Sequence, residues 1–159
     1  MTEKILVAVF SASGVTEKVG KEIARIAGAD FYEIVPKAIY TDADLNWNNS
    51  QSRSSVEMND PAARPEIDGT VADMASYGTV IVGFPIWWGM APRIIETFLE
   101  SYDFSGKKII PFCTSGGSGV GRSDTSLHKN VSGDVKWAKG RQINRPNEAE
   151  IRRWLKKVL

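Results

Sequence analysis

Three hydroxyl side chains and a glycine follow directly on a short apolar run near the start of the chain. The stretch reads S-A-S-G-V-T, in which Ser11, Ser13 and Thr16 surround Gly14. A glycine can adopt backbone angles that turn successive N–H groups inward, and hydroxyls can donate to phosphate oxygens. The loop therefore predicts a phosphate site built from neutral donors, with the alternative that Thr16 merely caps a helix.

This loop lacks the two best-known nucleotide signatures. No Gly-Lys-Ser/Thr follows it, as a P-loop would require, and the regularly spaced glycines of a dinucleotide fingerprint are missing. Hydrolysis of nucleoside triphosphates is therefore not expected.

Two adjacent tryptophans mark a second loop, P-I-W-W-G-M-A-P over residues 85–92. Trp87 and Trp88 offer broad apolar faces on which a flat ligand could stack. Gly89 would let the peptide backbone reorient beside such a ligand. The alternative is that both indoles pack into the core or an interface.

A third loop, C-T-S-G-G-S-G-V-G over residues 113–121, could bring backbone N–H groups to the edge of a ring. A hydrolase triad of Ser118, Asp124 and His128 can be imagined, but the G-x-S-x-G elbow is absent and a lone histidine on a polar helix is usually solvated. Cys113 lies in an apolar run, which favours a small buried residue over a redox centre.

The elements that must position these loops are strands and helices in alternation. Short branched apolar runs predict buried strands, and apolar residues at helical spacing predict the helices between them. We expect strands at 4–10, 30–36, 79–85, 107–114 and, more weakly, 135–143. We expect helices from the first loop to Gly28, over 67–77, from Pro92 to about Tyr102, after a cap at Ser123, and from about Asn147.

This alternation predicts a doubly wound, three-layer α/β sandwich around a parallel sheet. Ligands of such sheets bind beyond the carboxyl ends of the strands, which is where all three loops begin. The segment Lys37–Glu66 is too long for an ordinary connection, and its length predicts function or disorder.

Length and charge narrow the remaining possibilities. The 159 residues predict a single domain spanning 1–159, and the net charge of +1 indicates neither a nucleic-acid nor a membrane partner. One cysteine suits a reducing, cytoplasmic compartment, and we expect no metal site and no targeting or membrane-spanning segment. The basic residues of the last helix, from Arg152 to Lys157, fit a solvated face.

A phosphate loop, an aromatic clamp and backbone donors together suit a phosphorylated planar heterocycle. The residues resemble the flavodoxin-like family, whose phosphate signature of hydroxyl, any residue, hydroxyl, Gly, any residue and Thr is matched by S-A-S-G-V-T. Val15 stands where Asn is frequent. The stretches DLNWNN, RSSVEMND, FPIWWGMAP and YDFSGKKIIPFCTSGGSG are similar to a bacterial subgroup of FMN-dependent oxidoreductases.

The resemblance implies FMN as cofactor, bound where the strand order 2-1-3-4-5 of a five-stranded sheet reverses. It implies that the phosphate is held by Ser11, Ser13, Gly14, Val15 and Thr16. It implies that the isoalloxazine is lined by Pro85, Ile86, Trp87, Trp88 and Gly89, and flanked by Thr114, Ser115, Gly116, Gly117 and Gly121. Tyr40, Asn46 and Trp47 are candidates for a substrate pocket over the flavin edge.

Two functions follow from this resemblance. The first is an oxidoreductase that passes electrons from NAD(P)H through FMN to a small acceptor such as a quinone. The alternative is a non-enzymatic electron carrier that docks to partner redox proteins. Well-known carriers of this family are strongly acidic, so a near-neutral chain predicts a less negative potential for the second electron. No nicotinamide motif and no catalytic residue can be identified in the sequence.

Overall fold

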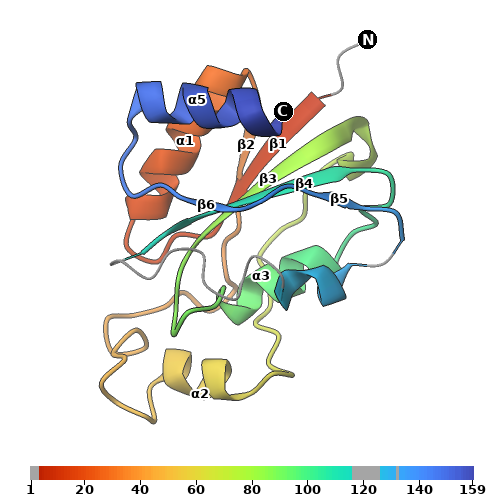
Figure 1. The fold of residues 1–159 in the computed structure, drawn as a ribbon. Coiled ribbons are helices and arrows are strands. Elements are labelled where there is room, and N and C mark those ends of the chain that lie inside the picture. Colours follow the sequence, from red (N-terminus) through yellow and green to blue (C-terminus); the bar gives the residue numbers. More distant parts are fainter. Residues whose placement is uncertain (1–3, 116–125, 132) are drawn as a thin grey trace.

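A parallel sheet forms the centre of the molecule (Figure 1). The computed structural model describes residues 4–115, 126–131 and 133–159. The strands are β1 (Lys4–Val9), β2 (Asp30–Glu33), β3 (Tyr77–Pro85), β4 (Lys108–Thr114), β5 (Lys136–Trp137) and β6 (Arg141–Gln142). Their order is β2-β1-β3-β4-β5, with β6 also paired to β4. The predicted parallel sheet in the order 2-1-3-4-5 is confirmed.

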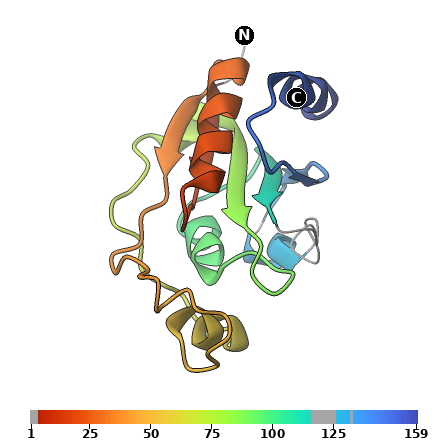
Figure 2. The same ribbon diagram turned by 90° about the vertical axis from the view of Figure 1, so that its left-hand side faces the viewer.

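Helices cover both faces of this sheet (Figures 1 and 2). The helices α1 (Val15–Ala27) and α5 (Glu148–Val158) lie on one face, and α3 (Arg93–Glu100) and the 3₁₀ helix η2 (Leu127–Asn130) lie on the other. Neighbouring residues of β1 enter different cores: Val7 packs with the α1 side and Ala8 with the α3 side. The predicted three-layer α/β sandwich is therefore confirmed.

The two helices on the first face begin and end where the sequence indicates. Gly28 adopts a left-handed conformation with φ of 65° and donates its N–H to the Ala24 carbonyl, which ends α1. The Asn147 side chain accepts the Glu150 N–H at 3.0 Å and starts α5. None of the helices within the described ranges is long and apolar enough to cross a membrane.

The predicted helix over 67–77 is wrong. Only a 3₁₀ helix, η1 (Met74–Ser76), forms there, and β3 already begins at Tyr77. Gly69 and Asp73 have φ of 91° and 57°, and such left-handed backbone cannot belong to a continuous right-handed helix. The connection between β2 and β3 instead contains α2 (Arg53–Asn59), capped by Ser52, inside the segment that showed little periodicity.

The fifth strand is split rather than continuous over 135–143. β5 pairs with the start of β4 and β6 with its end. On this edge of β4 the carbonyls of Ile109 and Cys113 accept N–H groups, and Pro111, midway between them, faces the same edge. Because proline has no N–H, Pro111 cannot donate a hydrogen bond to the neighbouring strand, and residues 138–140 separate β5 from β6.

Candidate functional site

The loops that follow β1, β3 and β4 are tied together at the carboxyl edge of the sheet. Phe10 donates its N–H to the Gly83 carbonyl at 3.0 Å, and Ile86 donates to the Thr114 carbonyl at 2.9 Å. The hydroxyl oxygens of Thr16 and Thr114 lie 2.8 Å apart, so a hydrogen bond joins the first loop to the third. The structure thus places the described parts of all three predicted loops side by side.

The first loop, Phe10–Thr16, is called the phosphate loop below. Gly14 has φ of 92° and ψ of −11°, and it stands at the N-cap of α1 without a side-chain cap. The Ser11 hydroxyl accepts the Gly14 N–H at 3.0 Å. The reading of Thr16 as a helix cap is therefore wrong, because Thr16 is buried and bonded to Thr114.

The phosphate loop leaves donors available to an anion. The first N–H groups of α1 have no carbonyl one turn earlier to accept them, and the positive end of the helix dipole lies at the same place. No atom of the described residues lies within 4 Å of the point where a Cβ of Gly14 would stand, so this part of the chain leaves the space above the loop open. This donor set suits a phosphate group.

The tryptophan loop forms a tight turn. Trp87 and Met90 exchange both backbone hydrogen bonds, at 2.8 and 3.0 Å, around Trp88 and Gly89. Both central residues have positive φ, 51° for Trp88 and 76° for Gly89, as in a type I′ β-turn. A tryptophan rarely adopts this conformation, and strained residues of this kind cluster at functional sites.

The two indoles have different surroundings. Trp87 packs edge-on against Phe10 and Tyr40, with ring centroids 5.8 and 5.5 Å away. Trp88 is 47% exposed and turned outward by the tight turn. Trp87 therefore serves largely to pack the core, whereas Trp88 has a ring face that a ligand could contact.

A cavity of about 430 Å³ opens between the phosphate loop and the tryptophan loop. It is lined by Ala12, Ser13, Leu45, Trp47, Ser54, Pro85, Ile86, Trp87 and Trp88. A second cavity of about 340 Å³ adjoins it and shares Trp47 and Trp88. The second is lined by Trp47, Asn48, Ser50, Ser55, Met58, Asn59, Trp88 and Met90.

Ser54 is a residue that the sequence reasoning missed. Ser54 lines the first cavity, and among the described residues its buried hydroxyl has no hydrogen-bond partner. A buried polar group without a partner in the protein is unusual. A mainly apolar cavity with one such hydroxyl and a phosphate loop at its end fits a flat ring with polar edges, as in a flavin nucleotide. In the sequence, Ser52 could have been recognised as the N-cap of a helix, and that helix would have included Ser54.

The segment Lys37–Glu66, called the ring-end segment below, forms the outer wall of both cavities. Within it the Tyr40 hydroxyl donates to Glu57, and the Arg53 guanidinium lies 3.7 Å from the centre of the Tyr40 ring. Arg53 also pairs with Glu57 at 2.9 Å. Burial, followed by the hydrogen bond to Glu57, raises the pKa of the Tyr40 phenol above its usual range.

A buried arginine of α3 fastens the ring-end segment to the rest of the protein. Arg93 is 3% exposed and donates to the carbonyls of Glu57 and Met58 at the end of α2, at 3.2 and 2.9 Å. Its charge is balanced by the buried Glu96, 2.7 Å away. The last turn of α2 thus has its free carbonyls satisfied by a residue of another element.

The three substrate-side candidates occupy different places. Tyr40 is buried against Phe10 and Trp87, and Asn46 is exposed, its side chain accepting the Asn48 N–H at 3.1 Å. Of the three, Trp47 alone is among the described residues that line the two cavities, and it is 69% exposed. Their predicted contact with a substrate stays a prediction.

The third loop is described only at its start. Thr114 is buried, and the Ser115 N–H donates to the Asn144 side chain at 2.8 Å. The predicted site residues Gly116, Gly117 and Gly121 lie outside the described residues, as do Ser118, Ser123 and Asp124.

Other candidates for chemistry can be placed. Cys113 is completely buried, and the exposed His128 lies against Trp137 with ring centroids 4.3 Å apart. In the part of the chain that the structure describes, no three His, Cys, Asp or Glu side chains gather as a metal site would require.

Comparisons with known proteins agree with this fold. The family model described as flavodoxin matches residues 4–158. A crystal structure of a candidate flavoprotein from Bacteroides eggerthii is 48% identical, with 99% of this chain and 98% of that chain covered and a TM-score of 0.93. A second, from Bacteroides uniformis, is 45% identical, with 98% and 99% covered and a TM-score of 0.92.

A more distant structure shares the fold. It is a flavoprotein from Lactobacillus acidophilus in complex with FMN, which is 22% identical over 97% of this chain and 99% of that chain, with a TM-score of 0.65. No curated protein gives a significant match.

Proposed function

Because the chain belongs to the flavodoxin family, we propose that it is an FMN-dependent oxidoreductase that passes electrons from NAD(P)H to a small, flat acceptor such as a quinone. The observation that carries the proposal is the pair of adjoining cavities, which share Trp47 and Trp88 beside the phosphate loop. FMN is the cofactor of this family, and a structural relative of this fold from Lactobacillus acidophilus binds it.

The chain's own residues would hold each end of FMN. The Gly14 turn, the first N–H groups of α1 and the hydroxyls of Ser11 and Ser13 would bind the phosphate. Thr16 and Thr114 would act as a pair that fixes the phosphate loop against β4. The isoalloxazine would occupy the first cavity, with Trp88 at its face and Ser54 in the surrounding wall.

FMN supplies the redox chemistry once bound, and the protein positions it and limits what can approach. Gly89 can change between positive and negative φ without a side-chain penalty, so the Trp88–Gly89 peptide can turn its polar groups toward or away from the ring. This freedom would let the Trp88–Gly89 peptide reorient when the protonation of the ring changes.

The second cavity suits a neutral acceptor. Its described lining consists of indoles, methionines, amides and hydroxyls, without a charged side chain. Amides can donate to the carbonyl oxygens of a quinone, and Trp47 and Trp88 can cover its faces. An acceptor held there would lie directly against the wall of the first cavity.

Trp88 supports a second candidate function. Its exposure places the tryptophan loop at the surface, where a partner redox protein could approach the ring edge directly. The chain would then be an electron carrier without turnover of its own.

Two measurements test these proposals in order. The purified protein is expected to show the visible bands of a bound flavin, or to acquire them after reconstitution with FMN. A protein that stays colourless after reconstitution would overturn the flavin proposal. Steady-state oxidation of NAD(P)H with a quinone then separates the enzyme from the carrier, since bound flavin without turnover leaves only the carrier.

A further inference from the structure

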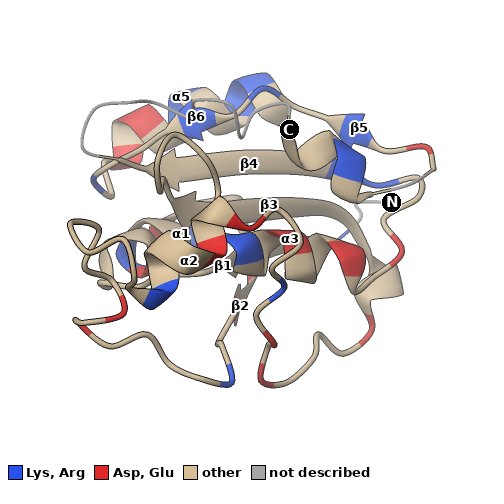
Figure 3. Ribbon diagram, turned by 90° about the horizontal axis from the view of Figure 1, so that it is seen from below, with Lys and Arg blue, Asp and Glu red and all other residues tan. Residues whose placement is uncertain are grey.

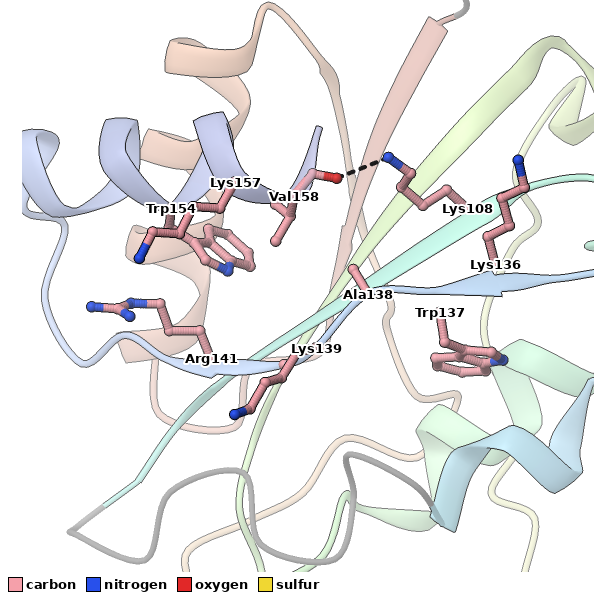
Figure 4. A pocket seen from close by; sticks show the side chains of 10 residues that line it. Lys108, Lys136, Trp137, Ala138, Lys139, Arg141, Trp154, Lys157 and Val158 are labelled. Atoms are coloured by element: carbon pink, nitrogen blue, oxygen red, sulfur yellow. Dashed lines mark hydrogen bonds between the residues drawn. The ribbon is translucent and has the colours of Figure 1, made fainter.

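A third cavity lies along the sheet edge that Pro111 interrupts, away from the phosphate and tryptophan loops. It has a volume of about 520 Å³ and is enclosed by β4, the β5–β6 connection and the end of α5 (Figure 4). The lining residues are Lys108, Lys136, Trp137, Ala138, Lys139, Gly140, Arg141, Trp154, Lys157 and Val158. Five of these ten carry a positive charge.

Basic residues gather on this side of the molecule although the chain as a whole is nearly neutral. Figure 3 shows Lys and Arg along β5, β6 and α5, and acidic residues of α5 only in its first turn. No Asp or Glu is among the described residues that line the cavity. A cluster of like charges in a hollow raises the local positive potential and attracts anions.

Two of the five charges are already partly engaged. Lys108 donates to the Val158 carbonyl at 2.9 Å (Figure 4), and Arg141 pairs with Glu150 at 3.1 Å. Lys136, Lys139 and Lys157 have no carboxylate within ion-pair distance in the described part of the chain. These three amines are available to an incoming anion.

This cavity shares no described lining residue with the two cavities of the flavin site. Its end at Lys108 lies about 20 Å along β4 from Thr114, because six residues of extended strand span that length, whereas Arg141 pairs with Phe112, two residues before Thr114. The cavity is also concave and of a size typical of small-molecule sites, which favours a compact ligand over a flat macromolecular surface.

We propose that the cavity between β4, the β5–β6 connection and α5 binds a small phosphorylated anion carrying a di- or triphosphate group. Figure 4 shows Lys139, Arg141 and Lys157 on the same side of Ala138 as Trp154, and Lys108 and Lys136 on the other side. Lys139 and Lys157 would contact the phosphate oxygens, the free N–H groups of Arg141 would add to them, and the Trp154 indole would form the inner wall. The site is independent of the proposed redox function.

Calorimetric titration of the FMN-loaded protein with inorganic triphosphate tests this site. Loading with FMN keeps the probe away from the phosphate loop. We expect saturable binding of one triphosphate per chain at low ionic strength, weakened about tenfold or more in the double variant Lys139→Gln and Lys157→Gln. The flavin spectrum of that variant should stay unchanged.

A matched variant, Lys37→Gln with Lys129→Gln, removes the same charge from lysines outside the cavity. It should keep triphosphate binding within about twofold. An equal loss of triphosphate affinity in both double variants, or no saturable binding by the parent, would overturn the proposal. Triphosphate would then be attracted only by the general positive charge of the surface.

Parallel titrations identify the source of the phosphate groups. If ATP binds more tightly than inorganic triphosphate, the ligand of the cavity is a nucleotide. If the two bind equally, the cavity recognises the phosphate chain alone. Binding of heparin without binding of triphosphate would overturn the small-anion site and leave a surface for polyanions.

Discussion

The phosphate loop and the ring-end segment form opposite ends of one site, but they are held in place by different forces. The phosphate loop is fixed chiefly by backbone, because the Phe10 N–H bonds to Gly83 and Gly14 turns the chain into α1, and one side-chain hydrogen bond, between Thr16 and Thr114, adds to this. The ring-end segment is fixed by side chains, chiefly Arg93 and the Tyr40, Glu57 and Arg53 cluster. The loop is part of the sheet's architecture, and the segment is attached to it.

This difference suggests a division of labour. A loop determined by backbone geometry suits a part of the ligand that never changes, such as a phosphate. A segment attached through side chains can vary without disturbing the sheet, and it suits the end where acceptors differ. Variants should therefore affect the two ends separately.

Replacing Arg93 should give the largest loss of stability among these variants, and it should loosen the ring-end segment. Arg93→Met leaves the buried Glu96 with less compensation and the end of α2 without its donor, and we expect a loss of about 3 kcal/mol in the free energy of unfolding. Denaturant unfolding measures this loss. Limited proteolysis should show faster cleavage within residues 37–66.

Two controls sharpen this prediction. Arg152→Met removes one partner of an exposed pair with Glu148 and should leave stability nearly unchanged. The double variant Arg93→Met with Glu96→Gln should recover part of the loss, because it removes the uncompensated charge. If Arg93→Met were as stable as the parent, the ring-end segment would not depend on side-chain attachment.

The next effect in size should come from Gly14→Val at the phosphate end. A Cβ at this position would meet no atom of the described residues within 4 Å, so the expected cost is strain of the left-handed backbone, about 1 to 3 kcal/mol. FMN affinity, measured by quenching of flavin fluorescence, should fall roughly 10- to 100-fold.

Gly28→Val provides a matched control for Gly14→Val. Gly28 has φ of 65° and equally open space, but it ends α1 at the far side of the helix. It should lower stability while leaving the FMN dissociation constant within about twofold. A similar loss of FMN affinity in both variants would mean that global destabilisation, and not the phosphate loop, is responsible.

A smaller effect is expected for Trp47→Ala at the ring end. The side chain borders both cavities and is largely exposed, so the KM for a quinone should rise about threefold to tenfold with little change in FMN affinity. Ile39→Ala, an equally exposed apolar residue of the same segment that is not among the lining residues, is the control. An unchanged KM in Trp47→Ala would remove this indole from the acceptor site.

The same contrast explains what could be predicted from the sequence. Gly14, the strand before it and the helix after it are neighbours in the chain, so local pattern located the loop, whereas the strand order was implied by the resemblance to the flavodoxin-like family. Arg93 lies 35 residues beyond Met58, whose carbonyl it satisfies, and no local pattern links the two. The prediction therefore missed α2 and Ser54, and it placed a helix at 67–77, where positive φ at Gly69 and Asp73 prevents one.

The smallest predicted effect is that of Tyr40→Phe, which tests the ring-end cluster through pH. At neutral pH the variant loses one hydrogen bond to Glu57, about 1 kcal/mol. In the parent, the folded state holds the Tyr40 proton more tightly than the unfolded state, because burial and Glu57 raise its pKa. That stability is fully present below the ordinary tyrosine pKa of about 10 and is lost as pH rises above it.

Unfolding free energies measured across this pH range should therefore fall less steeply in Tyr40→Phe than in the parent. Some slope should remain, since the hydrogen bond to Asp30 raises the pKa of Tyr77 to about 12 and burial raises the pKa of Tyr32, and both contributions have the same sign. Tyr77→Phe, far from the ring-end segment, should remove only the Tyr77 contribution and leave the Tyr40 contribution intact. Identical slopes in Tyr40→Phe and the parent would show that the Tyr40 phenol does not hold the ring end, and the attachment would then rest on Arg93 and the Arg53 pair.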